Sequence, residues 1–177
     1  MKPINVFVDT STVNRILDIG ISKPEHWRYE EDRLYLSKII EECVKKSKIK
    51  LFVNPSVKRE IEATPNLQRK KQLLAISEQL HFTPYNKTIF PFTFPAHYVT
   101  EEEKEMLQRL KSYMPKGFEK DTKFFLDALA DPEIDVLLTT DYDDLARKKL
   151  RDYLANEGVK IKIKIFAPKE LYEHLQG

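Results

Sequence analysis

The chain has 177 residues, 41% of them hydrophobic and 33% charged, with a formal net charge of +2. These values are typical of one globular domain, here residues 1–177, and give no global positive field that would by itself indicate nucleic-acid binding. The single cysteine, Cys43, excludes an internal disulfide and a multi-cysteine zinc site. No stretch approaches the ~20 apolar residues of a membrane span, and no signal-peptide pattern is present, so we expect a cytoplasmic protein with no membrane contact.

The first predicted strand is a buried apolar run that leads directly into a carboxylate. Residues 4–8 read Ile-Asn-Val-Phe-Val, and Asp9 follows them. Thr10 or Ser11 can cap the helix that begins there, although Asp9 could also serve as the cap. The buried face of this helix is predicted to comprise Val13, Ile16 and Leu17.

Helices and strands alternate through the rest of the chain. We expect helices at about 29–46, 55–63, 65–79, from 101, from 121 and at about 143–157, and strands at 49–53, 134–139 and 159–165. The last strand alternates apolar residues with lysines, as edge strands often do. Strands separated by helices imply a three-layer α/β/α fold with a central, mainly parallel sheet.

The strand at 134–139 also runs into carboxylates, because Asp141 and Asp144 follow Thr139 closely. Ligands bind at the carboxyl ends of parallel strands, so acids carried there by strands far apart in sequence predict one shared anionic site. Glu60 and Asp121, on helices between the two strands, can join it. Clustered carboxylates repel one another unless a cation compensates them, and oxygen ligands favour Mg²⁺ or Mn²⁺. The hydroxyls of Thr10, Ser11, Thr139 and Thr140 could hold a metal-bound water or a phosphate oxygen.

Each acid also has a purely structural interpretation. Asp9 and Asp141 could merely cap helices, Asp121 and Asp144 lie where helix-start acids are common, and Glu60 could be a solvated helix residue. It is the order and spacing of the acids that favour a functional site.

That order resembles the PIN domain of metal-dependent ribonucleases. The matching stretches are the strand ending in Asp9-Thr10-Ser11, residues 55–61 with Glu60, the helix opening at Asp121, and residues 137–145 with Asp141. The resemblance implies endonucleolytic cleavage of RNA at a site with one or two Mg²⁺ or Mn²⁺ ions. By position, it implies the acidic quartet Asp9, Glu60, Asp121 and Asp141, the further acid Asp144, and the small hydroxyl positions Ser11 and Thr139.

Two features depart from the compact members of this family. Asp127 could replace Asp121 as the third acid, although the distance to Asp141 favours Asp121. The chain also carries extra sequence, an inserted or extended region at about 64–118. That length leaves a toxin–antitoxin pair, with its antitoxin-like inhibitor, unsupported. Homodimers are common in the family, but nothing in the sequence marks one.

The expected partner is single-stranded RNA. Basic groups available to it are Lys45-Lys46, Arg69-Lys70-Lys71, Arg147-Lys148-Lys149 and the lysines of 160–164. The aromatic and proline-rich segment 82–98 could stack unpaired bases or could form an apolar flap. The main alternative function is a catalytically inactive PIN-like module that binds RNA or a protein. An aspartyl-phosphate phosphatase is disfavoured because Ser11 stands where its second Asp is required, and the residue set of a receiver domain cannot be placed.

Overall fold

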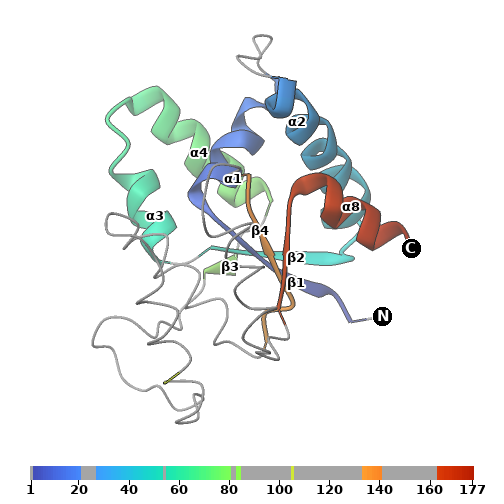
Figure 1. Cartoon of the computed structure of the whole chain (residues 1–177). Coiled ribbons are helices and arrows are strands. Elements are labelled where there is room, and N and C mark those ends of the chain that lie inside the picture. The colour runs from blue at the N-terminus through green and yellow to red at the C-terminus, as the bar shows by residue number, and fades with distance from the viewer. Residues whose placement is uncertain are drawn as a thin grey trace.

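The structure is a computed structural model of the whole chain, and it describes residues 2–20, 27–53, 55–80, 83–84, 105, 133–140 and 163–177. These residues form a mixed α/β fold in which helices pack on a parallel sheet (Figure 1). Within the same ranges, no helix has the length and apolar character that crossing a membrane requires.

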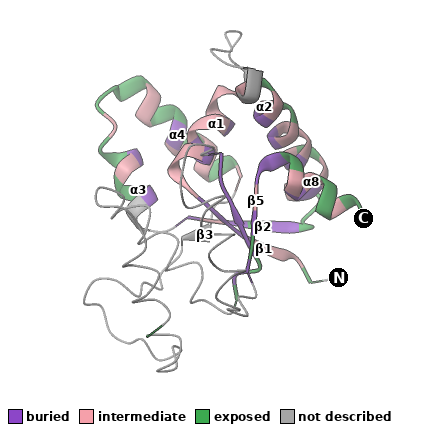
Figure 2. Ribbon diagram, in the orientation of Figure 1, coloured by how far each residue is buried: buried purple, intermediate pink, exposed green. Residues whose placement is uncertain are grey.

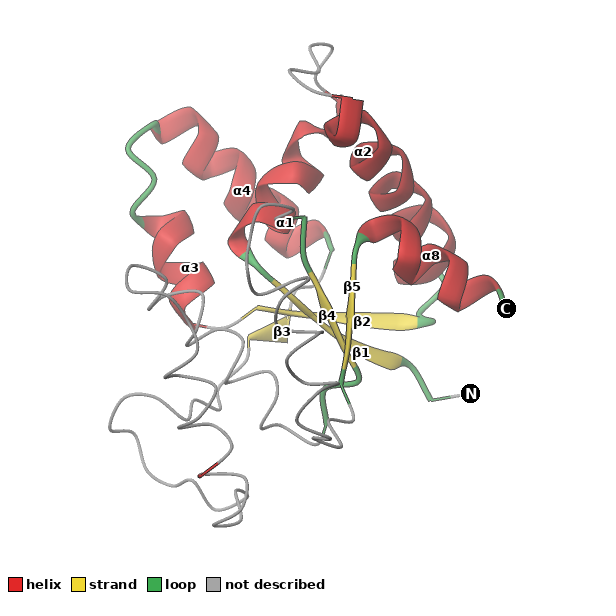
Figure 3. Ribbon diagram, in the orientation of Figure 1, coloured by secondary structure: helices red, strands yellow, loops and turns green. Residues whose placement is uncertain are grey.

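The sheet has the strand order β3-β2-β1-β4-β5, and every pairing is parallel. Figure 3 shows how the strands lie among the helices. The strands are β1 (Ile4–Val8), β2 (Ile49–Val53), β3 (Thr83–Pro84), β4 (Val136–Leu138) and β5 (Lys164–Phe166). In the register of the two central strands, Val8 lies opposite Leu138. Asp9 and Thr139, the next residue on each strand, therefore leave the sheet at the same edge.

The core lies along β1 and β4, which have buried side chains on both faces. Val6, Phe7 and Val8 are 0% exposed, and Leu137 and Leu138 are 0% and 1% exposed. Such continuous apolar runs are typical of inner strands in parallel sheets. Figure 2 shows buried residues concentrated on these strands and on the helix faces that turn toward them.

The helix after β1, α1 (Thr10–Leu17), is capped by Asp9 rather than by Thr10 or Ser11. The reason is that Asp9 keeps an extended backbone, with φ −86° and ψ 171°, and its side chain accepts from the Thr12 backbone N–H. Val13 and Ile16 are buried, as their spacing predicted.

The predicted helix at 29–46 is divided into two parts. The α-helix α2 (Trp27–Ile39) continues as one π-helical turn, Ile40–Val44, in which the Lys45 N–H donates to the Ile40 carbonyl. Cys43 lies in this turn and is fully buried.

Two helices follow β2 and lie beside α1 in Figure 1. They are α3 (Pro55–Glu62) and α4 (Leu67–Gln79). The second begins two residues later than predicted because the Asn66 side chain, accepting from the Arg69 N–H, provides the cap.

Two elements were not predicted. The first is the two-residue strand β3, which extends the sheet beyond β2. The second is α8 (Pro168–Gln176), which begins with Pro168 and packs against α2. Edge strand β5 confirms the end of the predicted strand at 159–165, with Ile163 and Ile165 buried and Lys164 exposed.

Several predictions fall on parts of the chain outside the described residues. These are the helices expected from 101, from 121 and at 143–157, of which only residue 105 is described, and the strand residues 159–162. Of the region at 64–118, residues 64–80, 83–84 and 105 are described. The single-domain organisation and the insertion therefore stay predictions.

Candidate metal centre

Asp9 lies where the two central strands of the sheet end. It follows the last residue of β1 and caps α1, so its carboxyl group is held at the junction of strand and helix. The Thr139 hydroxyl, which follows the end of β4, donates to Asp9 Oδ2 over 2.5 Å. Two residues 130 positions apart in the chain thus meet at the carboxyl edge of the sheet.

Among the described residues, the groups that donate hydrogen bonds to this carboxyl group include two hydroxyls and a backbone N–H. Besides Thr139, the Thr12 N–H donates to Oδ1 over 2.7 Å, and the Ser11 hydroxyl lies 2.9 Å from both oxygens. The Thr140 hydroxyl in turn donates to Ser11 Oγ over 3.0 Å. Three of the four hydroxyls that were expected to hold a metal-bound water or a phosphate oxygen, those of Ser11, Thr139 and Thr140, are therefore engaged with the Asp9 carboxylate or with each other. Those of Ser11 and Thr139 contact the carboxylate directly and fix its orientation.

The surrounding protein raises the pKa of Asp9. Desolvation is the largest cause, and the hydrogen bonds from Thr12, Thr139 and Ser11 act in the opposite direction by favouring the charged form. Asp9 as a whole residue is only partly buried. Its carboxyl group is thus poorly hydrated in a residue that is not fully enclosed, which is a setting found at functional sites.

Glu60, the second predicted acid, is hydrogen-bonded to Thr10, the residue that follows Asp9. It lies on α3, and the Thr10 hydroxyl donates to Glu60 Oε2 over 2.5 Å. Asp9 is the N-cap of α1 and Thr10 is the first residue of this helix. The start of α1 therefore positions both carboxylates: Asp9 directly, and Glu60 through its hydrogen bond with Thr10. The role of Thr10 was not predicted, since a lone hydroxyl gives no sequence signal for its partner on another helix.

The remaining predicted acids, Asp121 with its alternative Asp127, Asp141 and Asp144, lie outside the described residues. So does the aromatic segment 82–98, apart from Thr83 and Pro84. In the part of the chain that is described, no three His, Cys, Asp or Glu side chains group closely enough to hold a metal ion. Of the predicted metal ligands, Asp9 and Glu60 are described, so their oxygen atoms and hydrogen-bond partners can be compared with what a metal ion requires.

Their donor set fits a hard divalent cation. Both offer carboxylate oxygens, which Mg²⁺ and Mn²⁺ prefer, and the groups that donate to Asp9 are hydroxyls and a backbone N–H. An ionised carboxylate has about four acceptor positions, and donors from the described residues occupy part of that capacity. Ordered hydrogen-bond donors behind a carboxylate are also what metal sites use to orient their ligands.

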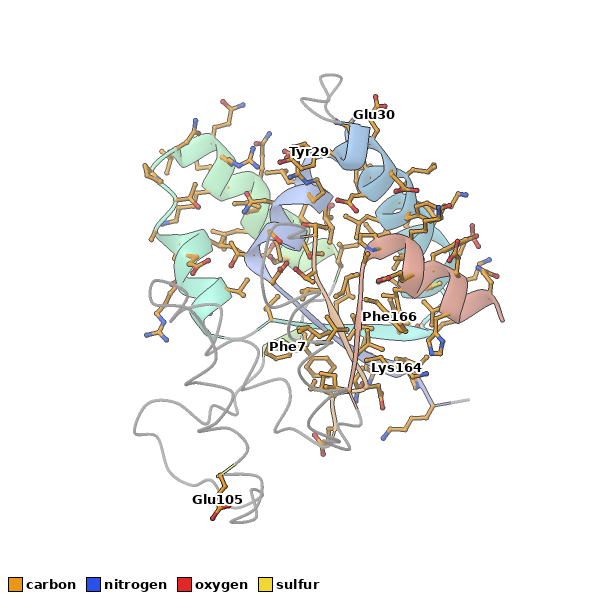
Figure 4. All side chains as sticks on the ribbon, in the orientation of Figure 1. Phe7, Tyr29, Glu30, Glu105, Lys164 and Phe166 are labelled. Carbon is orange, nitrogen blue, oxygen red and sulfur yellow. The ribbon has the colours of Figure 1, made fainter. Side chains whose placement is uncertain are left out.

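Several of the predicted basic groups have partners within the chain. Lys45 pairs with Glu41 at 2.6 Å, and Arg69 binds side chains of α1. The Lys70 ammonium donates to the Glu62 carbonyl, and Lys164 lies 3.3 Å from the His174 ring nitrogen. Figure 4 labels Lys164 next to Phe166 on β5. Lys71 is exposed.

No protein-family model matches this sequence, and a comparison with curated proteins gave no match.

Proposed function

We propose that the chain is a Mg²⁺- or Mn²⁺-dependent endoribonuclease of the PIN type, which hydrolyses phosphodiester bonds of single-stranded RNA. The observation that carries the proposal is the Asp9 carboxylate. It lies at the carboxyl end of a central strand, its hydration is reduced, three donors orient it, and Glu60 is attached to the adjacent residue.

A capping role alone does not account for these surroundings. A helix cap needs one acceptor for a backbone N–H, and the Thr12 N–H uses that acceptor. Two hydroxyls, from Ser11 and Thr139, also converge on the carboxyl group, and the desolvation that raises its pKa disfavours its charged form. Costly arrangements of this kind are characteristic of sites that bind a charged ligand.

In the proposed site, Asp9 and Glu60 hold the cation together with Asp121, Asp141 and Asp144. Asp141 follows Thr139 by two residues, and Thr139 contacts Asp9 directly, which supports including Asp141. When bound, a divalent cation neutralises charge on the phosphoryl oxygens as the phosphodiester is cleaved. The family resemblance further leads us to propose helices on both faces of the sheet.

The described residues contribute orientation and charge. Ser11 and Thr139 hold both oxygens of Asp9 so that the carboxylate does not turn away from the site. Thr10 holds one oxygen of Glu60, and in the proposed site the other oxygen binds the cation. Fixed ligands of this kind lower the reorganisation that substrate binding and cleavage require.

The test is cleavage of a fluorophore-quencher single-stranded RNA in Mn²⁺, followed with and without chelator. Asp9→Asn keeps the cap oxygen but removes the charge, and we expect at least a ~100-fold loss of the cleavage rate. Glu60→Gln should also lose most activity. Glu62→Gln is the matched control, because Glu62 lies two residues further along α3 and is exposed.

Full activity of Asp9→Asn, or cleavage that persists in chelator, would exclude the proposed mechanism. RNA binding without cleavage in the unmodified chain would instead favour the inactive RNA-binding module. Thermal unfolding of each variant separates loss of activity from loss of fold.

A further inference from the structure

Arg69 reaches from α4 to the side chains of Asn14 on α1 and of Asp18, the residue that caps the end of α1. Its Nε and Nη2 atoms lie 3.2 and 3.0 Å from Asn14 Oδ1, and Nη2 lies 3.3 Å from Asp18 Oδ1. The planar guanidinium group can place two N–H groups on one acceptor while a third reaches its neighbour, which a lysine ammonium cannot do in the same geometry. Arg69 is therefore fixed against α1.

The contact determines how the Asn14 amide is oriented. Because its oxygen accepts from Arg69, its nitrogen is the end that faces back along the helix, and Nδ2 donates to the Thr10 carbonyl over 3.0 Å. Thr10 is the residue whose hydroxyl holds Glu60. A continuous path thus runs from Arg69 to the Glu60 carboxylate. It consists of three steps of hydrogen bonding joined by the covalent bonds of Asn14 and Thr10.

The same three helices are also joined elsewhere. The Lys70 ammonium of α4 donates to the Glu62 carbonyl near the end of α3, and α1, α3 and α4 contact one another pairwise. Figure 1 shows α3 and α4 on one side of α1, and α1 also packs against α2 on its other side. The Arg69 contact joins α4 to α1. Because α4 also contacts α3, we expect a change at Arg69 to alter the position of α1 relative to α3.

We propose that Arg69 is a positioning residue for Glu60, acting through Asn14 and Thr10. The inference rests on the proposed function in taking Glu60 as a metal ligand. It assigns Arg69 a role different from that of a phosphate contact, which the basic run Arg69-Lys70-Lys71 would otherwise suggest. The side chain is only partly exposed and its N–H groups point at α1.

The first experiment needs no metal. Urea unfolding in chelator is measured for the unmodified chain, Arg69→Met, Thr10→Val and the double variant. If Arg69 acts on the Thr10–Glu60 link, its loss matters less once that link is broken, and the effects on the folding constant should be non-additive by about threefold or more. Additive effects would overturn the proposal.

The second experiment is calorimetric titration with Mn²⁺ under conditions where circular dichroism shows each variant to be folded. Arg69→Met and Asn14→Leu should each weaken Mn²⁺ binding about tenfold, as loss of groups behind a metal ligand does. Asp18→Ala removes the other contact of Arg69, together with the 3.9 Å pair between Asp18 and Arg15, and should leave the affinity unchanged. Lys71→Met is the charge-matched control on the same helix and should also leave it unchanged. Arg69→Lys keeps the charge and should weaken binding in the same direction, which provides a milder variant if Arg69→Met does not fold.

The outcomes are distinguishable. If the unmodified chain binds no Mn²⁺, the proposed function fails, while the metal-free cycle still decides whether Arg69 acts on the Thr10–Glu60 link. If Asp18→Ala weakens Mn²⁺ binding as much as Arg69→Met, then Arg69 acts by stabilising α1 as a whole. It does not act through Asn14 and Thr10 in that case, and the proposal is wrong. If Arg69→Met raises only the KM for RNA and leaves Mn²⁺ affinity intact, Arg69 is a substrate contact and the proposal is again wrong.

Discussion

Thr10 and Glu60 lie 50 positions apart in the chain, and the hydroxyl of Thr10 donates to the Glu60 carboxylate over 2.5 Å. The bond joins the first turn of α1 to the second turn of α3. It connects the acid on α3 to the helix that Asp9 caps, and so sets the relation between the two described acids of the candidate site.

Removing this hydroxyl should weaken both the fold and the site. Thr10→Val keeps the side-chain shape but leaves the partly buried carboxylate without this donor, and we expect a loss of about 1–2 kcal/mol in the free energy of unfolding. Thr10→Ser retains the hydroxyl and should stay close to the unmodified chain. Urea denaturation at neutral pH measures both. Equal losses for the two variants would show that the methyl group, not the hydrogen bond, matters here.

Asp9→Asn should make the metal-free protein more stable at about pH 7. Burial raises the folded pKa of Asp9 above its ordinary value of 3.8. A carboxyl group with a raised folded pKa contributes stability that is fully present below the unfolded pKa and is lost as pH rises through the folded pKa. The amide cannot ionise and keeps the cap oxygen, so the variant avoids that loss.

Thermal unfolding in chelator across the acidic and neutral range provides the measurement. The difference between the variant and the unmodified chain should be smallest near the unfolded pKa and should grow as pH rises. A variant that is destabilised by the same amount at every pH would mean that its lost hydrogen bonds outweigh the relief of buried charge.

The central strands could be predicted because strands buried on both faces have a recognisable sequence pattern, a continuous apolar run. The runs that became β1 and β4 are apolar on both faces, and the carboxyl ends of parallel strands share an edge, so Asp9 and Thr139 were expected close together. The alternating lysines likewise predicted the edge position of β5.

Strand β3 and the contact between Arg69 and Asn14 have no comparable sequence pattern. Strand β3 is two residues long and contains a proline, so neither length nor periodicity indicates it. The bond between Arg69 and Asn14 joins residues 55 positions apart, and only the packing of α4 on α1 brings them together. Helix α8 does carry signals, since Pro168 stands at its first turn and the Glu170 side chain accepts from the Ala167 N–H. Those signals were overlooked rather than absent.

The contact of α8 with the π-helical turn Ile40–Val44 predicts a shifted tyrosine titration. The Tyr172 hydroxyl donates to Glu42 over 3.0 to 3.1 Å, and this hydrogen bond, followed by desolvation, raises the pKa of Tyr172 above its ordinary value of 10.0. Glu42→Gln removes the charge, so the pKa should fall back toward that value. The tyrosinate absorbance lost in Tyr172→Phe identifies which of the 8 tyrosines is responsible.

The same shift has a consequence for stability. Because the folded pKa of Tyr172 is raised, its contribution is fully present below the unfolded pKa and disappears as pH rises through the folded pKa. Tyr172→Phe should therefore flatten the decline of stability in strongly alkaline solution. An unchanged alkaline profile would show that the contact with Glu42 does not help to hold α8. At the other end of α2, Tyr29 makes a cation–π contact with Arg15 of α1. The Cζ atom of Arg15 lies 3.6 Å from the centroid of the Tyr29 ring, which Figure 4 labels.

Thr139→Val tests whether orientation of Asp9 matters for the metal. The substitution is nearly isosteric in a side chain that is 1% exposed, and it removes the donor to Asp9 Oδ2. Since the hydroxyl favours the charged form of Asp9, its loss should weaken Mn²⁺ binding about tenfold and lower kcat. The KM for RNA should change little, because the hydroxyl faces the carboxylate. Thr139→Ser preserves the donor and should retain most of the affinity. If the serine variant is as impaired as the valine variant, the γ-methyl packing of Thr139 is what the site needs. If both bind Mn²⁺ like the unmodified chain, the metal does not depend on the orientation of Asp9.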